Sequence, residues 1–236
     1  MLNFSDPLFW KSMLVRVPVV LVALSTHEFS HAFAAFKCGD DTAKYNGRLT
    51  LNPLAHLDPI GTLCLMFAPI GWAKPVPVNP MNFRNPRIDD IKVSLAGPGS
   101  NFLLAIGSFI LLKLLLMTFA EPAPVLVMAL YISLIINFAL MLFNLLPLFP
   151  LDGSHVVQNM LRYPHSEAFA RFSQKAPLIL MGVIFFDFFI LPRVLGFSIL
   201  WTIFSFPSGF MIDNFLSSKE IQIFNIAQLK FLGHIQ

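Results

Sequence analysis

The chain has 236 residues, of which 56% are hydrophobic and 12% are charged, whereas soluble domains average about 45–50% apolar and about 25% charged residues. This composition excludes a disordered chain and disfavours a soluble globular enzyme, because water does not tolerate so much exposed apolar surface. The net charge of +3 forms no basic stripe, so we expect no nucleic-acid partner. Cys38 and Cys64 form no CxxC pair, which disfavours a disulfide framework and a thiolate metal site.

The first long apolar stretch, Val17–Phe36, follows two basic residues and in this respect resembles a secretory signal. We reject that interpretation because the apolar pattern continues past any plausible cleavage point. The stretch also contains three ionisable residues, His27, Glu28 and His31, which a discarded segment has no reason to hold. We therefore expect a transmembrane helix that carries function.

The following region, Cys38–Pro59, is polar and rich in turn residues. Within it Arg48–Leu51 alternates as a short strand does, which predicts a small β element beside the membrane. The next apolar stretch, Ile60–Trp72, covers only about 13 residues, which is short for a full span. We expect it to be a re-entrant or interfacial segment.

Two later stretches, Val93–Ala120 and Val125–Leu148, are long and apolar enough to span a bilayer. Ala176–Leu191 and Ile199–Ile212 are weaker candidates. The predicted fold is an all-α polytopic membrane protein with about five to six transmembrane helices.

We expect one membrane-embedded domain over residues 1–236. Its core motifs lie in residues 17–161, further C-terminal spans lie at about 176–212, and a short tail covers 213–236.

The distribution of basic residues predicts an orientation, provided that Ile60–Trp72 turns back. Residues 37–92 then hold seven Lys and Arg and residues 152–175 hold three, and we expect both regions to share a face with the tail lysines, Lys219 and Lys230. The opposite face keeps fewer basic residues. The positive-inside rule makes the first face cytoplasmic and places the N-terminus outside.

The strongest motif is His27-Glu-Phe-Ser-His31, an H-E-x-x-H pattern. On a helix the i, i+4 spacing places both imidazoles on one face, as two zinc ligands require. Glu28 lies between them, close enough to deprotonate a water on the metal. Ionisable groups this deep in a membrane helix are costly unless they are paired, metal-bound or in a wet cavity.

Zinc needs a third protein ligand, and Asp152 is the best candidate. Pro147 and Pro150 break the long helix before it, and Gly153 lets the backbone turn the carboxylate inward. Asp152 can share an ion with His31 only if an even number of membrane crossings separates them, which again requires that Ile60–Trp72 turns back.

Five motifs in order resemble the site-2 protease family, peptidase family M50, in its short prokaryotic type without PDZ or CBS domains. They are His27–His31, Gly47–Gly61, Gly71–Pro80, Ala96–Asn101 and Leu151–Gly153. The resemblance implies a zinc endopeptidase in which His27, His31 and Asp152 bind one Zn²⁺ and Glu28 is the general base. It also implies transmembrane protein substrates and a multi-pass location, and we expect the cytoplasmic membrane of a prokaryote with the active site toward the cytoplasm.

Two asparagines fit the need for a donor to the oxyanion formed during peptide hydrolysis. Asn101 opens a span after a Gly-Pro-rich break, and Asn144 precedes Asp152 by one or two turns. The ordinary alternatives are a helix cap for Asn101 and an interhelical hydrogen bond for Asn144.

The segment Lys74-Pro-Val-Pro-Val78 predicts a substrate-binding edge. If it is extended, Pro75 and Pro77 remove the donors from one edge, while Val76 and Val78 keep theirs on the other. An unwound substrate could pair there as an added strand. A rigid loop with a blunted edge is an equally good explanation.

Three other polar residues have no firm assignment. His56 is best explained by a local hydrogen bond in its loop, and His155 could be an alternate ligand. Asp187 lies in a phenylalanine cluster and needs a partner that the sequence does not name.

We conclude from the sequence that the chain is an intramembrane zinc endopeptidase, with the lipid bilayer and membrane-protein substrates as its partners. A homo-oligomer stays open. The rival classes are a membrane metal-ion transporter, whose ligands would be spread along a path, and a non-catalytic protein of the same fold, which would have lost Glu28 or a ligand.

Overall fold

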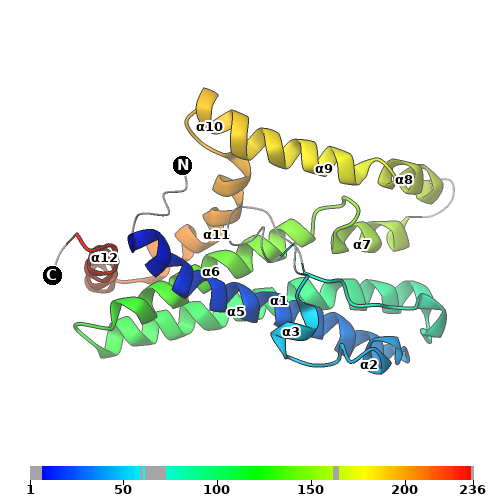
Figure 1. Cartoon of the computed structure of the whole chain (residues 1–236), viewed down its shortest axis with the longest axis horizontal. Helices are drawn as coiled ribbons and strands as arrows, with labels where there is room; N and C mark the ends of the chain where they lie inside the picture. The colour runs from blue at the N-terminus through cyan, green and yellow to red at the C-terminus, as the bar shows by residue number, and fades with distance from the viewer. Residues whose placement is uncertain (1–6, 59–60, 62–72, 162–164, 235–236) are drawn as a thin grey trace.

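The computed structural model describes residues 7–58, 61, 73–161 and 165–234, and these parts of the chain are almost entirely helical. Three long helices form the centre: α1 (Pro7–Cys38), α5 (Pro86–Thr118) and α6 (Pro124–Asn144). They lie side by side along the long axis of the molecule, with α5 packed against both α1 and α6 (Figure 1).

Shorter elements follow in chain order around these three. Between α1 and α5 lie α2 (Thr42–Tyr45), α3 (Pro53–His56) and the 3₁₀ turn η1 (Pro80–Asn82). After α6 come α7 (Asp152–Met160), α8 (His165–Ser173), α9 (Ala176–Phe185), the π-helical turn η2 (Phe186–Ile190), α10 (Leu191–Val194), α11 (Ile199–Phe215) and α12 (Ser218–Leu232).

Local sequence explains where the long helices begin and end. Asn85 caps α5 by accepting a hydrogen bond from the Ile88 N–H, and Pro86 takes the first position, where a missing N–H costs nothing. The α6 helix ends at Asn144, three residues before Pro147, as the two prolines predict. Ser217 and Glu220 form a capping box that starts α12.

The interior between α5, α6 and the C-terminal helices is apolar, with Leu112, Leu116, Val127 and Leu134 fully or almost fully buried. The outward faces of the same helices carry large apolar side chains, such as Leu103 and Met117, which are exposed. A helix that is apolar all round fits a lipid environment.

Within the described residues, four helices are long and apolar enough to cross a membrane: Pro7–Cys38, Pro86–Thr118, Pro124–Asn144 and the continuous helix Ala176–Val194. These helices overlap four of the five stretches that the sequence predicts as candidate spans. The remaining stretch forms α11, which is 17 residues long and is not among the candidate spans. The chain is an integral membrane protein, and the predicted count of five to six spans is not confirmed by the described residues.

The predicted β element is not confirmed either. Residues 48–51 form an irregular bend where a strand was expected, and within the described ranges the only β pairing is an isolated antiparallel bridge between Leu57 and Ala73. Side-chain alternation was misleading here because Arg48 points inward and is buried through main-chain contacts described below. The predicted re-entrant segment, Ile60–Trp72, lies outside the described residues except for Gly61.

The predicted position of the tail is wrong. Lys230 in α12 is 3.6 Å from Glu121 in the α5–α6 connection, and Lys11 at the start of α1 donates to the Phe231 carbonyl at 2.6 Å. The tail therefore lies at the N-terminal end of α1, opposite the end that carries His31. The sequence predicts the opposite position because Ile199–Ile212 counts as a candidate span, whereas α11 does not cross back along the molecule (Figure 1).

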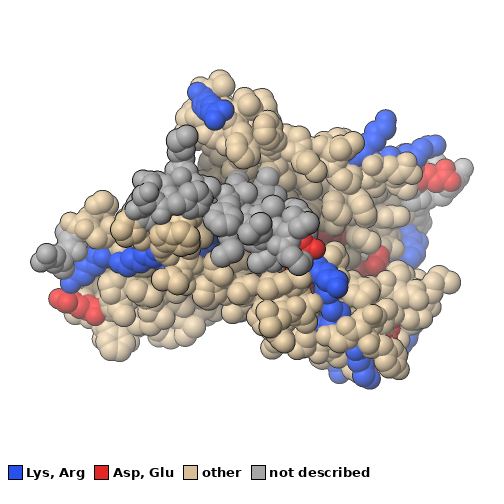
Figure 2. All heavy atoms as spheres, viewed as in Figure 1, with Lys and Arg blue, Asp and Glu red and all other residues tan. Residues whose placement is uncertain are grey.

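Figure 2 shows Lys and Arg side chains gathered at both ends of the long axis, over α2 and α8 at one end and near α12 at the other. Basic atoms also lie over α10, which contains Arg193. Even when Lys219 and Lys230 are counted on the N-terminal face, the face that carries residues 37–92 and 152–175 has more basic residues.

Candidate metal centre

The α1 helix presents two imidazoles to the interior from one face. His27 and His31 are one turn apart and buried, and their rings meet edge to face with centroids 4.6 Å apart. Their Nε2 atoms are 3.0 Å apart. The spacing of the H-E-x-x-H motif thus produces the predicted pair of converging nitrogens.

The other nitrogen of each ring has a fixed partner. His31 Nδ1 lies 2.7 Å from the Val93 carbonyl oxygen, which can only accept, so His31 donates from Nδ1. His27 Nδ1 lies 2.6 Å from Asn101 Oδ1. Donation from both Nδ1 atoms leaves the Nε2 lone pairs free to bind a metal.

Asp152 completes the group from the first turn of α7. Its Oδ2 atom is 3.3 Å from the Nε2 atom of each histidine, and its side chain is 21% exposed. The α5 and α6 helices lie between His31 and Asp152 in the sequence; the predicted even number of crossings also depends on Ile60–Trp72, which lies outside the described residues except for Gly61. The predicted role of Gly153 needs correction: a Cβ there would meet the Leu145 and Leu146 carbonyls, so this glycine allows α7 to approach the end of α6.

The arrangement fits a cation. The three ligand atoms lie within 4.8 Å of one another, and all three carry lone pairs. Asp152 Oδ2 is buried with no hydrogen-bond partner among the described residues, and a buried unpaired carboxylate oxygen is costly. Two imidazoles and one carboxylate are a ligand set that suits catalytic zinc.

A glycine on α5 makes room for the two rings. A Cβ at Gly97 would overlap His31 Nε2 and would lie 2.6 Å from His27 Cε1. The backbone of α5 can therefore approach the imidazoles only because residue 97 has no side chain.

Glu28 lies beside this group and is half-buried. Its Oε2 atom accepts a hydrogen bond of 3.1 Å from the Val76 N–H. The predicted general base and the predicted substrate-binding segment are therefore in direct contact.

The segment from Lys74 to Asn79, which forms neither helix nor strand, is held at both ends. The Arg48 guanidinium donates to the Lys74 carbonyl and, at 3.2 Å, to the Pro75 carbonyl. At the other end the Asn79 N–H donates to Asp40 Oδ2 at 2.7 Å. Val76 and Val78 lie between these attachments and are half-buried.

The amide groups of the two predicted oxyanion donors both make hydrogen bonds within the protein. Asn101 has no exposed surface, and its amide nitrogen donates to the Ala23 carbonyl at 3.3 Å and to Asn137 Oδ1 at 2.9 Å. Asn144 donates to the Leu140 carbonyl of its own helix at 3.0 Å. Asn101 is thus engaged with a ligand, His27, while the nearest polar partner of Asn144 is main chain.

His56 and His155 each have a polar partner outside the metal-ligand group. His56 is buried, with Nε2 2.8 Å from the Thr50 carbonyl, as its loop setting predicts. His155 Nδ1 is 3.5 Å from Asp90 Oδ2, and this hydrogen bond, opposed by partial burial, raises its pKa. His155 is not part of the metal-ligand group within the described chain.

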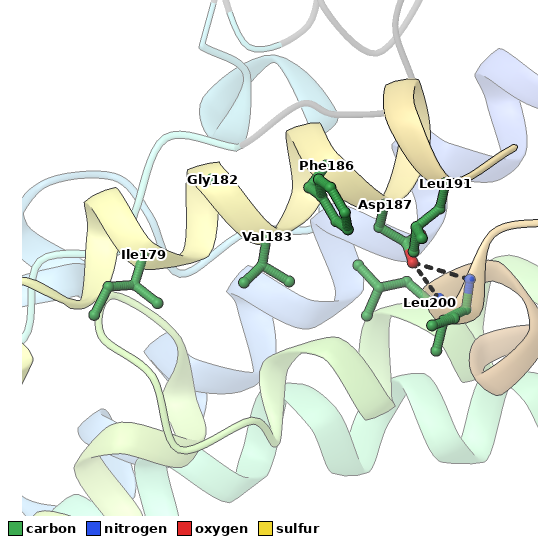
Figure 3. A pocket seen from close by; sticks show the side chains of 8 residues that line it. Ile179, Gly182, Val183, Phe186, Asp187, Leu191 and Leu200 are labelled. Carbon is green, nitrogen blue, oxygen red and sulfur yellow. Dashed lines mark hydrogen bonds between the residues drawn. The ribbon is translucent and has the colours of Figure 1, made fainter. Parts of the chain in front are cut away.

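The partner of Asp187 is a helix N-terminus. Its carboxylate accepts from the Ile199 N–H at 2.9 Å and from the Leu200 N–H at 3.1 Å (Figure 3). It also accepts from the Ser198 hydroxyl. Asp187 therefore attaches η2 to the start of α11. It borders an open, mainly apolar groove of about 500 Å³ between these elements.

Sequence reasoning missed three residues that shape the site: Gly97, Arg48 and Asn137. Each carries a weak signal, since Gly97 and Arg48 lie in quoted motifs and Asn137 is a polar residue within an apolar span. Their roles depend on contacts between distant parts of the chain.

Known proteins resemble this chain over the same region. The family model for peptidase family M50 matches residues 16–185. The Bacillus subtilis protein YwhC, whose name describes a zinc metalloprotease, is 45% identical over 148 residues, which cover 61% of this chain and 68% of YwhC. The Rip2 proteins of Mycolicibacterium smegmatis and of Mycobacterium tuberculosis H37Rv, also named as zinc metalloproteases, are 33% and 32% identical.

Each Rip2 match covers 68% of this chain and 62% of the relative, so the chain spans less than two thirds of those proteins. No solved structure matches the chain significantly. The M50 match covers most of the chain and includes all three ligand residues of the candidate site. The chain belongs to peptidase family M50, the site-2 protease family, and is a zinc metalloprotease.

Proposed function

We propose that the chain hydrolyses peptide bonds in or near the transmembrane segments of membrane proteins. The observation that carries the proposal is the convergence of His27, His31 and Asp152 at one point between membrane helices, with Glu28 beside them. Clustered ligands favour hydrolysis over ion transport, for which ligands would be spread along a path.

In this proposal His27, His31 and Asp152 hold the ion, and Glu28 handles the protons. Zinc, when bound, supplies a Lewis acid that lowers the pKa of water and polarises a carbonyl. The Glu28 carboxylate accepts the proton of the attacking water and delivers it to the leaving amine. Water is the nucleophile, so no acyl-enzyme is expected.

The segment from Lys74 to Asn79 is the proposed substrate edge. Its contact with Glu28 supports this assignment, because a strand paired along this edge runs past the proposed base. A substrate that pairs with Val76 competes with Glu28 for the Val76 N–H, whereas the Val78 N–H has no such competitor among the described contacts.

The site face is proposed to be cytoplasmic, in a prokaryotic membrane, because the site-bearing end keeps the larger share of basic residues.

The Glu28→Gln variant tests the catalytic proposal. It keeps the shape of the side chain and removes the base, so zinc content is expected to stay at one per chain while cleavage of a transmembrane substrate falls by about 10²–10⁴-fold. Normal turnover in this variant would refute the role of Glu28.

A further inference from the structure

A chain of buried hydrogen bonds runs from His27 through α5 into α6. His27 Nδ1 contacts Asn101 Oδ1 at 2.6 Å, and Asn101 Nδ2 donates to Asn137 Oδ1 at 2.9 Å. Asn137 Nδ2 in turn donates to the Ser133 carbonyl at 2.9 Å. Asn101 and Asn137 have 0% and 1% of their surface exposed, so water does not compete for these contacts.

The direction of every hydrogen bond in the chain follows from its far end. A main-chain carbonyl can only accept, so Asn137 must turn its Nδ2 toward Ser133 and its Oδ1 toward Asn101. Asn101 must then turn its Nδ2 toward Asn137, where the Ala23 carbonyl also accepts from it. Its Oδ1 faces His27, so His27 donates from Nδ1 and keeps the lone pair on Nε2.

Rotation of either amide by 180° would be costly. A rotated Asn101 would place its oxygen against the Ala23 carbonyl and against Asn137 Oδ1, which brings acceptors together in a buried site. A rotated Asn137 would place its oxygen against the Ser133 carbonyl. The two carbonyls therefore select one orientation for both amides.

Both histidines donate from Nδ1, but to different kinds of acceptor. His31 donates directly to a carbonyl, that of Val93, whereas His27 depends on two side chains for its acceptor. We infer that Asn137 is a positioning residue that, through Asn101, holds the proton of His27 on Nδ1 and thereby sets the affinity of the site for zinc. The inference rests on the proposed role of His27 as a ligand, and it assigns Asn101 to the ligand instead of the oxyanion.

The test compares Asn137→Leu, Asn101→Leu and the double variant with the wild type, using metal-free protein in detergent. Zinc affinity is measured by competition with a fluorescent chelator. Nitrogen-15 NMR of histidine-labelled protein reports which ring nitrogen is protonated, with His27→Ala used to assign the signal. Thermal unfolding checks that each variant is folded.

Asn101→Leu is expected to weaken zinc binding by about 10–100-fold, as loss of a residue that orients a metal ligand typically does. Asn137→Leu is expected to weaken it by about 10-fold and to convert part of His27 to the form protonated on Nε2. The double variant should bind zinc no more weakly than Asn101→Leu, because Asn137 acts only through Asn101.

Ser108→Ala is the matched control. Ser108 is buried and contacts the Ser133 hydroxyl at 2.8 Å. Asn137 Nδ2 also donates to this hydroxyl, at 3.2 Å, but a hydroxyl can donate or accept, so it is the Ser133 carbonyl that fixes the direction. Its removal should leave zinc affinity unchanged.

An unchanged zinc affinity or an unchanged His27 protonation state in folded Asn137→Leu would overturn the inference, as would additive losses in the double variant. Retention of zinc by His27→Ala would instead refute the metal centre itself. The two failures are therefore distinguishable.

Discussion

At the scale of single residues, the site depends on the three ligand side chains and also on a glycine, Gly97, whose missing side chain leaves room for the histidine rings. His27, His31 and Asp152 follow from motif and chemistry, and the structure brings the three side chains together. Gly97 is different, because its importance arises only where α5 crosses the two imidazoles. A sequence shows which residue lacks a side chain but does not show what would occupy the space.

Gly97→Ala is expected to eliminate zinc binding, since the added methyl group would overlap His31 Nε2. Zinc content should fall from about one per chain to near zero while helix content stays close to the wild type. Gly107→Ala on the same helix is the control, because a Cβ there has nothing within 4 Å. Full zinc content in the Gly97 variant would show that α5 can withdraw from the rings.

Asp40 is a second residue whose effect can be predicted. Burial opposes its ionisation, but hydrogen bonds from the Asn79 N–H, Thr42 and Asn82 outweigh burial and lower the pKa of the carboxyl. A lowered pKa stabilises the fold above the unfolded-state value of 3.8, and that stabilisation is lost as the pH falls through the folded-state pKa.

Asp40→Asn is therefore expected to lower the free energy of unfolding by about 1–3 kcal/mol at pH 7, measured by denaturant unfolding in detergent. The difference from the wild type should shrink below pH 3.8. Asp41→Asn serves as the comparison, because Asp41 is more exposed and makes only a 3.5 Å ion pair with Lys44. Equal effects of the two substitutions would contradict the role of Asp40.

At the scale of elements, α1, α5 and α6 could be predicted from hydropathy, and the end of α6 from Pro147 and Pro150, because these signals are local. The region between α1 and α5 could not. Residues 48–51 look like a strand because their side chains alternate, yet Arg48 is buried by contacts with carbonyls about 26 residues later in the chain. Contacts with main-chain atoms so far along the chain produce no pattern of hydrophobic residues that a sequence analysis could detect.

Arg48→Leu should release one end of the Lys74–Asn79 segment and weaken its contact with Glu28. Substrate cleavage is expected to fall by about 10-fold, as when positioning contacts are lost, while zinc content stays at one per chain. Arg87→Leu is a suitable control, because Arg87 also donates to main-chain carbonyls, those of Asn159 and Leu161, but is exposed. Equal activity of Arg48→Leu and the wild type would show that the position of Lys74–Asn79 does not affect catalysis.

Val78→Pro tests the proposed substrate edge more cleanly than a change at Val76, whose N–H already contacts Glu28. Proline at residue 78 removes one edge donor and should cripple cleavage without loss of zinc. Pro77→Ala, which adds a donor to the opposite edge, should cleave normally. Unimpaired cleavage by Val78→Pro would dispose of strand pairing.

At the scale of the whole molecule, the composition predicts a membrane protein and the order of motifs predicts the family. The number of spans and the position of the tail were not predictable in this way. Both depend on α11, which is apolar but remains on the N-terminal side and brings α12 beside Lys11 and Glu121.

The revised topology predicts that Lys44 and Lys219 lie on opposite sides of the membrane. Single cysteines at these positions, in a background without Cys38 and Cys64, should differ in labelling by a membrane-impermeant maleimide in intact cells. Lys219→Cys should be labelled and Lys44→Cys protected until the cells are opened. Labelling of both, or protection of both, would contradict the arrangement.

The most direct test of the central claim is the zinc stoichiometry of the detergent-purified protein beside His31→Ala and Asp152→Ala, with folding checked by circular dichroism. The account predicts about one zinc per chain in the wild type and near none in either folded variant. Zinc retained without Asp152 would contradict the three-residue centre and the pairing of α1 with α7 on which the proposed mechanism depends.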